Sequence, residues 1–451
     1  MSQFDVEAFI DRQKIGPRQI LILAICTLFC FIDGFDIFMI GKIAPAIAEG
    51  FDEPPAAMTQ LFLYQQIGLA VGAFLVAPLG DRFGRRTMLV VSAILFGTLS
   101  LVSIWAQSLH QLSILRGVGG IFMSAGLPLA VALIAETTPK PRRATFIAIA
   151  MAGYSTGSAA SGAVAAFLLD DYGWQSAFWI AGLVPLLCVP LLLLFVPESI
   201  KFRTERNARD PAIARTIARL YPAADLTGVD SFALGTSREK PKKARLLDIF
   251  ADGRGFSTTI LWICCFLSMS NIALLGAWLP TFFQEMAGVP IQRFAIVAMI
   301  AFSGGFAGTL IMGYLMDRFR PAPVIACAYV VLAAALVTLG YVPFEAPLFI
   351  AVLILWSFCQ SGGQSGLNTF ITYAYPPRMR STGLGWSGGA GRIGGILIAP
   401  TFGGFALQQG LTLQTTLLCV AVSPLIVAAL ILLLGYRQSR RPESSLQPAT
   451  A

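Results

Sequence analysis

The stretch GDRFGRR at residues 80–86 is matched in the second half of the chain by MDRFRP at residues 316–321. Each copy follows a long apolar run and opens a basic connection. The two aspartates, Asp81 and Asp317, are 236 residues apart. A stretch that recurs at this distance in a chain of 451 residues predicts that the second half repeats the first.

A second motif recurs at nearly the same distance. PKPRRAT at 139–145 is matched by PPRMRST at 376–382, and Arg143 and Arg380 are 237 residues apart. Two motifs with one nearly constant offset are hard to obtain by chance, so we infer an internal duplication.

Apolar segments recur along the whole chain. Hydrophobic residues make up 56% of it and charged residues 12%, and the mean hydropathy is +0.72. A soluble domain carries about 25% charged residues, whereas roughly 20 apolar residues are enough for a membrane-spanning helix. Twelve such spans are predicted, at 20–45, 57–80, 87–106, 110–135, 145–169, 174–197, 256–284, 290–316, 321–341, 347–375, 381–408 and 411–435.

Six spans precede a long polar segment and six follow it. The repeat is therefore parallel, with its axis along the membrane normal. We expect an all-α membrane protein with this division: an N-terminal segment 1–19, a six-helix bundle 20–197, a linker 198–255, a second six-helix bundle 256–435 and a tail 436–451. Part of the linker, DPAIARTIARLYP, has the pattern of a short surface helix.

The basic residues are unevenly distributed. Of 32 Lys and Arg, 28 lie in the termini and in alternate connections. This asymmetry orients the chain with its basic connections in the cytoplasm, so both termini, the linker and the tail are expected there. It also explains the net charge of +8 better than nucleic-acid binding does.

The sequence offers no chemistry for an enzyme. There is one histidine, His110, and all eight cysteines fall inside apolar spans, so no metal site is expected. A Walker A loop and a nucleophilic triad are both absent from the sequence. We therefore expect no cofactor and no nucleotide-driven step.

Several motifs resemble those of a known family. The DRFGRR loop, its second copy, VPES at 196–199 and the six-linker-six layout resemble the major facilitator superfamily. Four further stretches resemble its bacterial aromatic acid:proton symporters: DGFD at 33–36, LRGVGGIFMSAGLPLAVALIAE at 115–136, GGQSGLN at 362–368 and RSTGLGWSGGAGRIGG at 380–395. The resemblance implies a twelve-helix transporter in a bacterial inner membrane, with the proton as coupling ion.

Two carboxylates stand inside the first apolar span. Asp33 and Asp36 are three residues apart, so they share a helix face. A carboxylate at the centre of a spanning helix costs about 2.5–3.5 kcal/mol, so it usually faces a cavity or a partner. We interpret the pair as the proton-coupling site, as the resemblance also implies. The alternative is an ion pair that only holds helices together. Gly34, between them, permits a close approach to the backbone.

Two arginines also lie within spans. Arg116 enters the fourth span from its outer end, and Arg392 lies near the middle of the eleventh. Our hypothesis is that Arg116 pairs with the aspartates of its own bundle, while Arg392 meets the carboxylate of the substrate. The two roles could be exchanged, and either arginine could be an ion-pair partner only.

Aromatic and amide side chains could contact a substrate ring. Gln360, Gln364 and Asn368 recur at every fourth position and share one helix face. They are expected to line a cavity, because amides facing lipid would be unsatisfied. The candidate aromatic walls are Trp278, Trp356, Tyr154, Trp386 and Phe35. For any one of these aromatics taken alone, core packing or lipid contact is the better interpretation.

Charged residues gather in the repeated loops. We expect a gate of ion pairs formed by Asp81, Arg82, Arg85, Arg86, Glu136 and Arg143, with Asp317 and Arg318 as the second copy. The alternative is ordinary positive-inside anchoring. Lys42, near the outer end of the first span, is expected to extend its amine to the membrane interface.

The sequence thus predicts a carrier that imports an aromatic carboxylate with protons, working within the lipid bilayer and sufficient as a monomer. The alternatives are an importer of a non-aromatic organic acid (a dicarboxylate or a muconate-like acid), an exporter of a drug or metabolite, and a transporter-like sensor. The fifth span, GYSTGSAASG at 153–162, contains no proline. Its composition argues against the drug exporters of the superfamily, which carry a proline-containing signature there.

Overall fold

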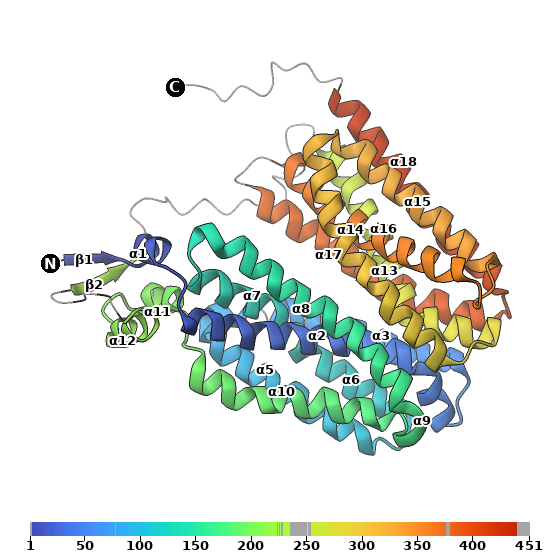
Figure 1. The fold of residues 1–451 in the computed structure, drawn as a ribbon, viewed down its shortest axis with the longest axis horizontal. Helices are drawn as coiled ribbons and strands as arrows, with labels where there is room; N and C mark the ends of the chain where they lie inside the picture. The colour runs from blue at the N-terminus through green and yellow to red at the C-terminus, as the bar shows by residue number, and fades with distance from the viewer. Residues whose placement is uncertain are drawn as a thin grey trace. The chain divides into compact units, whose positions relative to one another are not determined.

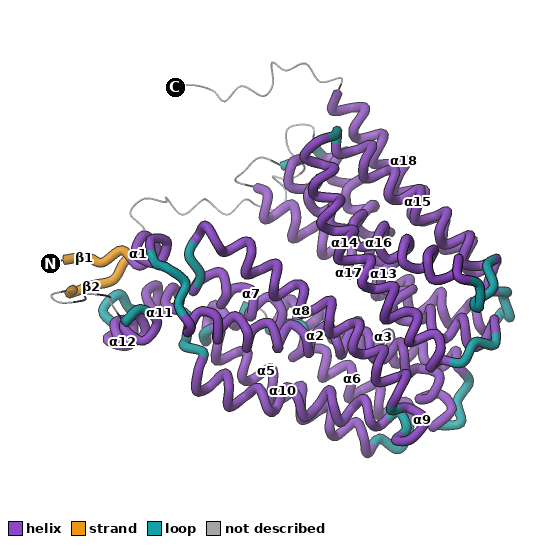
Figure 2. The backbone as a smooth tube through the Cα atoms, in the orientation of Figure 1, coloured by secondary structure: helices purple, strands orange, loops and turns teal. Residues whose placement is uncertain are grey.

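Helices form almost the whole of the computed structural model, which describes residues 2–76, 78–222, 224, 226, 229–234, 250, 254–375 and 379–439 (Figure 2). The chain divides into two compact units. The N-terminal unit is Met1–Pro241 and the C-terminal unit is Lys242–Ala451. The described part of the linker therefore belongs largely to the N-terminal unit.

The N-terminal unit contains twelve α-helices and two single turns of 3₁₀ helix among its described residues. They are α1 (Val6–Arg12), α2 (Pro17–Gly50), η1 (Pro55–Ala57), α3 (Met58–Leu75), α4 (Leu79–Phe83), α5 (Arg85–Val102), η2 (Ser103–Trp105), α6 (Leu109–Met123), α7 (Gly126–Thr137), α8 (Lys140–Phe167), α9 (Leu169–Tyr172), α10 (Gln175–Phe195), α11 (Ile200–Arg206) and α12 (Pro211–Leu220).

The C-terminal unit has six long helices in its described part. They are α13 (Gly255–Ala287), α14 (Ile291–Arg318), α15 (Pro321–Tyr341), α16 (Pro347–Ala374), α17 (Arg380–Gln408) and α18 (Leu413–Ser439). Within the described residues of both units, eleven helices are long and apolar enough to cross a membrane. The fifth predicted span is α8, which has 28 residues but is richer in Gly, Ser and Ala.

The predicted duplication is visible in how each unit packs. In the N-terminal unit α2 packs along α8, α3 along α6 and α5 along α10. The equivalent pairs of the C-terminal unit are α13 with α17, α14 with α16 and α15 with α18. The same three pairings in both halves show that the sequence repeat is a structural repeat.

The fourth predicted span is interrupted. It consists of α6 and α7, which are separated at Ser124 and Ala125. Pro128 explains the break, because proline has no N–H to donate to the carbonyl of Ser124 and its ring crowds that carbonyl. The expected single helix at 110–135 is therefore two shorter ones.

Glycines bring α2 and α8 into backbone contact. A Cβ added to Gly34 would lie 2.0 Å from the carbonyl oxygen of Tyr154. A Cβ added to Gly157 would lie 1.9 Å from the carbonyl oxygen of Phe31. Small residues at such crossings allow helices in a membrane to approach closely. Here they hold the part of α2 that carries the sequence DGFD directly against α8.

A small layer, not anticipated from the sequence, covers one end of the N-terminal unit. β1 (Ser2–Asp5) pairs in parallel with β2 (Val229–Ala233), and both lie with α1, α11 and α12 at that end (Figure 1). The layer is tied to the bundle by hydrogen bonds from Gln19 to the carbonyl of Leu220 (3.3 Å) and from Tyr221 to the carbonyl of Thr137 (3.4 Å).

The surface helix predicted in the linker is confirmed as α12. It begins after Asp210, whose carboxylate accepts a hydrogen bond from the N–H of Ala212 at 2.9 Å, as a helix N-cap does. The end of the unit that carries residues 82–86, 140–143 and 198–206 is called the basic end below.

Replacing Gly157 with alanine should destabilise the protein, because the added methyl group meets backbone atoms of α2 that cannot move aside. We expect a loss of about 1–3 kcal/mol, typical of overpacking, seen as a lower unfolding temperature in detergent. Gly388 in α17 is the matched control, since no described atom lies within 4 Å of a Cβ added there. Its alanine variant should be as stable as the wild type or more so, and equal behaviour of the two variants would contradict the packing described.

Candidate functional site

A buried ion pair joins α2 to α6. Asp36 is fully buried and Arg116 is 2% exposed. The guanidinium group binds the carboxylate with two nitrogens, Nη1 lying 2.9 Å from Oδ1 and Nη2 in contact with Oδ2. This two-pronged geometry is the strong form of the arginine–carboxylate interaction. Removing either partner would leave an uncompensated charge, at a cost of about 3–5 kcal/mol.

Aromatic rings complete the surroundings of Arg116. Its guanidinium carbon lies 6.0 Å from the ring centre of Phe96 in α5 and 5.6 Å from that of Phe178 in α10. Contacts of this kind favour a cation over the ring face. Four helices, α2, α5, α6 and α10, therefore meet around one charged side chain.

Asp33 lies about halfway along α2, one turn before Asp36, and is 5% exposed. Phe35, one of the predicted aromatic walls, is buried two residues further along α2 and stacks on Phe31 with ring centres 6.5 Å apart. Tyr154 of α8 is half-buried and meets Phe38 edge-to-face at 6.3 Å. Both predicted walls thus lie at the crossing of α2 and α8.

The prediction for Lys42 is wrong. The side chain is 3% exposed and does not reach an interface. Its amine donates hydrogen bonds to the carbonyl oxygen of Ser158 (2.5 Å) and to Oγ of Ser161 (2.8 Å), both in α8. Lys42 shares a helix face with Phe31, Phe35 and Phe38, spaced by three or four residues, and this periodicity could have revealed that it faces α8.

A second charged group lies at the basic end. Arg85 is buried and bonds to Asp81 at 2.9 Å and to Glu136 at 3.4 Å. Glu136 also accepts a hydrogen bond from Ser199. These four residues, called the charged cluster, join α4, α5 and α7 to the residue that precedes α11. Three predicted gate residues therefore meet, together with Ser199, which the sequence analysis did not single out.

The other predicted gate residues have different partners. The backbone N–H of Arg86 binds Glu198 at 3.0 Å, and its guanidinium group binds backbone carbonyls of α10. Arg143 lies 3.7 Å from Asp11 of α1. Arg82 is exposed and stacks on the ring of Phe83 at 5.4 Å.

The second copy of the loop motif is exposed. Asp317 and Arg318 both lie at the end of α14 with exposed side chains. Arg318 donates a hydrogen bond to the hydroxyl of Tyr314 at 3.1 Å. The DRF side chains are exposed in both copies, but in the first copy Asp81 pairs with buried Arg85, and the equivalent position of the second copy is Pro321.

The amides of α16 lie on one face, as their spacing predicts. Gln364 donates to Asn368 at 3.1 Å and accepts from Ser268 of α13 at 2.6 Å. Ser268 also bonds to the hydroxyl of Tyr329 of α15 at 2.7 Å. Gln364 and Asn368 thus belong to a polar network that links α13, α15 and α16.

Gln360 stands apart from this network. It is 6% exposed, and neither polar atom of its amide has a hydrogen-bond partner among the residues that the structure describes. Leaving a buried polar group unsatisfied costs about 1–3 kcal/mol. An amide held in this way can recognise a polar group of a bound molecule.

The remaining candidates lie on α17 and α13. Arg392 is exposed and follows Gly391, whose added Cβ would lie 2.7 Å from the side chain of Met269 in α13. Trp386 is 44% exposed and stacks on Trp262 of α13 at 6.3 Å. Trp386 therefore lies at the contact between α13 and α17, and Arg392 directly follows a glycine of that contact.

Two other predicted aromatic walls are core residues. Trp278 is fully buried against Gly403 and stacks on Phe282 at 6.0 Å. Trp356 is 4% exposed. Within the described residues, no group of three or more His, Cys, Asp or Glu side chains could hold a metal ion.

Comparisons with known proteins agree with this architecture. The chain matches the family model of the Major Facilitator Superfamily over residues 26–400 and 261–450. It is 33% identical to a gallate transporter of Pseudomonas putida, covering 98% of each chain. It is 30% identical to the 4-hydroxybenzoate transporter PcaK of the same organism, covering 87% of each chain.

The fold also matches solved structures. A bacterial homologue of the human lysosomal transporter Spinster superposes with a TM-score of 0.72 at 16% identity, over 95% of this chain and 100% of that chain. At this identity the match shows the fold alone. Together these matches confirm the predicted all-helical fold and exclude an enzyme, and we conclude that the chain is a multi-pass secondary transporter that belongs to the Major Facilitator Superfamily.

Proposed function

We propose that the protein imports an aromatic carboxylate together with protons across the inner membrane of a bacterial cell. The observation that carries the proposal is the pair of carboxylates buried in the middle of α2, one of them bound by an arginine. The substrate class is supported by relatives that are named as gallate and 4-hydroxybenzoate transporters and that align with nearly the whole chain.

Buried carboxylates suit proton coupling for a physical reason. Burial disfavours the charged form of an acid, and a neighbouring cation favours it. Asp36 has Arg116 as a fixed counter-ion, whereas Asp33 is buried one turn away. A change of hydration around α2 during transport would shift the proton affinity of Asp33 between uptake and release. Arg116 then acts as a positioning residue that keeps α2 in place while Asp33 exchanges its proton.

Recognition of the substrate is assigned to the C-terminal unit. Arg392 would bind the carboxylate of the substrate, since its planar guanidinium group matches two oxygens at once. Gln360 would bind a ring hydroxyl, because its amide is buried and has no partner among the described residues. Trp386 is the aromatic side chain of this unit that is proposed to contact the ring.

The charged cluster is proposed as a gate. Its ion pairs join helix ends at the basic end of the N-terminal unit, which the distribution of Lys and Arg assigns to the cytoplasm. Breaking such pairs would shift the balance between two states of the carrier. Exposed Arg82, Asp317 and Arg318 are available to exchange partners when the state changes.

The proposal is tested by uptake of labelled 4-hydroxybenzoate into proteoliposomes with and without an inward proton gradient. We expect accumulation above the external concentration only when the gradient is present, since the gradient supplies the free energy. Collapsing the gradient with a protonophore should abolish the accumulation. Accumulation of the acid without a gradient would contradict proton coupling, and an absence of both uptake and binding would contradict the substrate class.

Gln360→Leu should weaken substrate binding without weakening the fold. We expect KM for uptake to rise about tenfold, the value of one hydrogen bond of roughly 1.4 kcal/mol. The unfolding temperature should stay the same or rise, because a buried unpaired amide is removed. Gln364→Leu is the matched control: it breaks the bonds to Ser268 and Asn368, so it should lower stability. An unchanged KM for Gln360→Leu would remove this residue from the site.

A further inference from the structure

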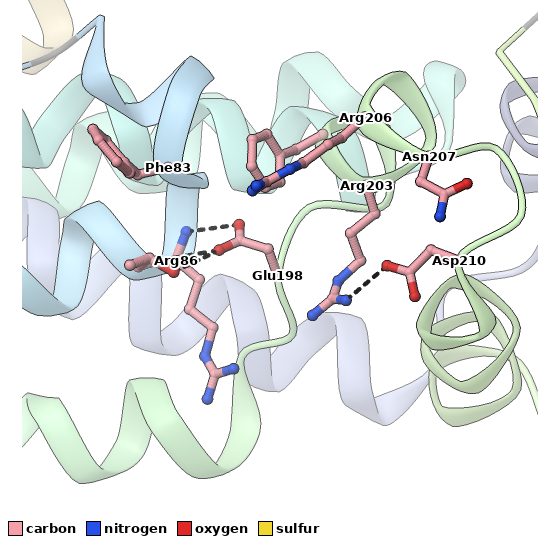
Figure 3. A pocket seen from close by; sticks show the side chains of 9 residues that line it. Phe83, Arg86, Glu198, Arg203, Arg206, Asn207 and Asp210 are labelled. Atoms are coloured by element: carbon pink, nitrogen blue, oxygen red, sulfur yellow. Dashed lines mark hydrogen bonds and ion pairs between the residues drawn. The ribbon is translucent and has the colours of Figure 1, made fainter.

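A pocket of about 430 Å³ lies at the basic end of the N-terminal unit, beside the charged cluster. It lies between Phe83 at the end of α4, the first turn of α5 and the segment from Glu198 to Asp210 (Figure 3). Three arginines line it, Arg86, Arg203 and Arg206, together with the carboxylates of Glu198 and Asp210. The lining side chains thus carry one more positive than negative charge.

The carboxylates of Glu198 and Asp210 both form hydrogen bonds within the protein. Glu198 accepts a hydrogen bond from the backbone N–H of Arg86 at 3.0 Å, at the N-terminus of α5. Asp210 accepts one from the N–H of Ala212 at 2.9 Å and pairs with Arg203 at 3.1 Å. The N–H of Ala212 and the guanidinium group of Arg203 keep the pKa of Asp210 below its ordinary value. This carboxylate therefore remains charged and serves as the N-cap of α12.

Arg203 is paired with Asp210, whereas the other two arginines of the pocket have no ion pair among the described residues. Nε of Arg86 donates to the carbonyl oxygen of Leu192 at 3.2 Å, a neutral partner at the end of α10. Arg219, close to the pocket, donates to the carbonyl of Leu194 at 2.5 Å. Among the residues that the structure describes, none forms an ion pair with Arg206. The pocket therefore presents guanidinium donors to an incoming anion.

Exposed apolar side chains lie next to the pocket. Arg86 binds carbonyls in the last turn of α10, one of the membrane-length helices. In that turn Leu193 is 49% and Leu194 61% exposed, and Phe83 at the pocket is 50% exposed. Apolar side chains beside arginines mark the boundary between hydrocarbon and headgroups, where long cationic side chains extend toward the polar layer.

We propose that this pocket binds a phosphate group, supplied by the headgroup of an anionic phospholipid or by free phosphate. The planar guanidinium groups match the oxygens of phosphate bidentately, and the adjoining leucines match acyl chains. A phosphate group bound there joins α11 to the first turn of α5. It thereby reinforces one edge of the charged cluster.

The test follows the unfolding temperature of the purified full-length protein in nonionic detergent. Short-chain phosphatidylglycerol, phosphatidylcholine of equal chain length, or inorganic phosphate is added at increasing concentration. A ligand of the folded state raises the unfolding temperature by mass action, so each titration gives an apparent affinity. We expect a saturable rise with phosphatidylglycerol and a much smaller one with phosphatidylcholine.

Two variants locate the binding. Arg206→Ala should weaken the apparent affinity for phosphatidylglycerol about tenfold, as expected for loss of a charge-assisted hydrogen bond, and Arg206→Glu should abolish the response. Arg209→Ala is the matched control, since Arg209 is exposed, lies three residues further along the chain and is not part of the pocket lining. It should behave as the wild type does.

The outcomes separate the two sources of phosphate. A response to inorganic phosphate that Arg206→Ala weakens, with no gain from the lipid, would support the site and assign free phosphate as its ligand. Equal responses of the Arg206 and Arg209 variants would overturn the proposal, as would the absence of a saturable response to either anion. None of these readouts depends on transport, so they stand apart from the test of the proposed function.

Discussion

The ion pair between Asp36 and Arg116 is the interaction on which the N-terminal unit depends. Two full charges are removed from water, and their mutual contact, with the rings of Phe96 and Phe178 near the guanidinium group, compensates for the loss of hydration. Keeping that contact requires α2, α6 and the rings from α5 and α10 to hold their positions. The close crossing of α2 and α8 at Gly34 and Gly157 places Asp33 on the same rigid framework.

Much of the fold could be predicted because it depends on sequence patterns that extend over many residues. The apolar runs locate the helices, and the constant offset between Asp81 and Asp317 predicts the duplication that appears in the helix pairings. The break at Ser124 was missed, although Pro128 is a local signal for it. The pairing of β1 with β2 could not be foreseen, because two short strands more than 200 residues apart carry no periodicity long enough to be recognised.

For the candidate site, charge inside apolar spans indicated burial in the N-terminal unit but not for Arg392, and it was a poor guide to partners. Arg116 and Asp36 meet as their shared bundle suggests, and the amides of α16 share a face because their spacing requires it. Arg143 pairs instead with Asp11, and Lys42 with α8. Those partners depend on helix rotation and on the layer at the basic end. The two copies of the loop motif differ in their partners, because Asp81 pairs with Arg85, whereas the position equivalent to Arg85 in the second copy is Pro321.

The most direct test of the account compares accumulation with exchange in Asp33→Asn. Asn removes the ionisable group but leaves the Asp36–Arg116 pair intact, which Asp36→Asn would not. Both activities are measured in proteoliposomes with one labelled aromatic acid, as uptake driven by a proton gradient and as counterflow without one. The account predicts that the variant loses gradient-driven accumulation and keeps counterflow, because substrate can still move when no proton must be released. Accumulation at the wild-type level would show that Asp33 does not carry the coupling proton.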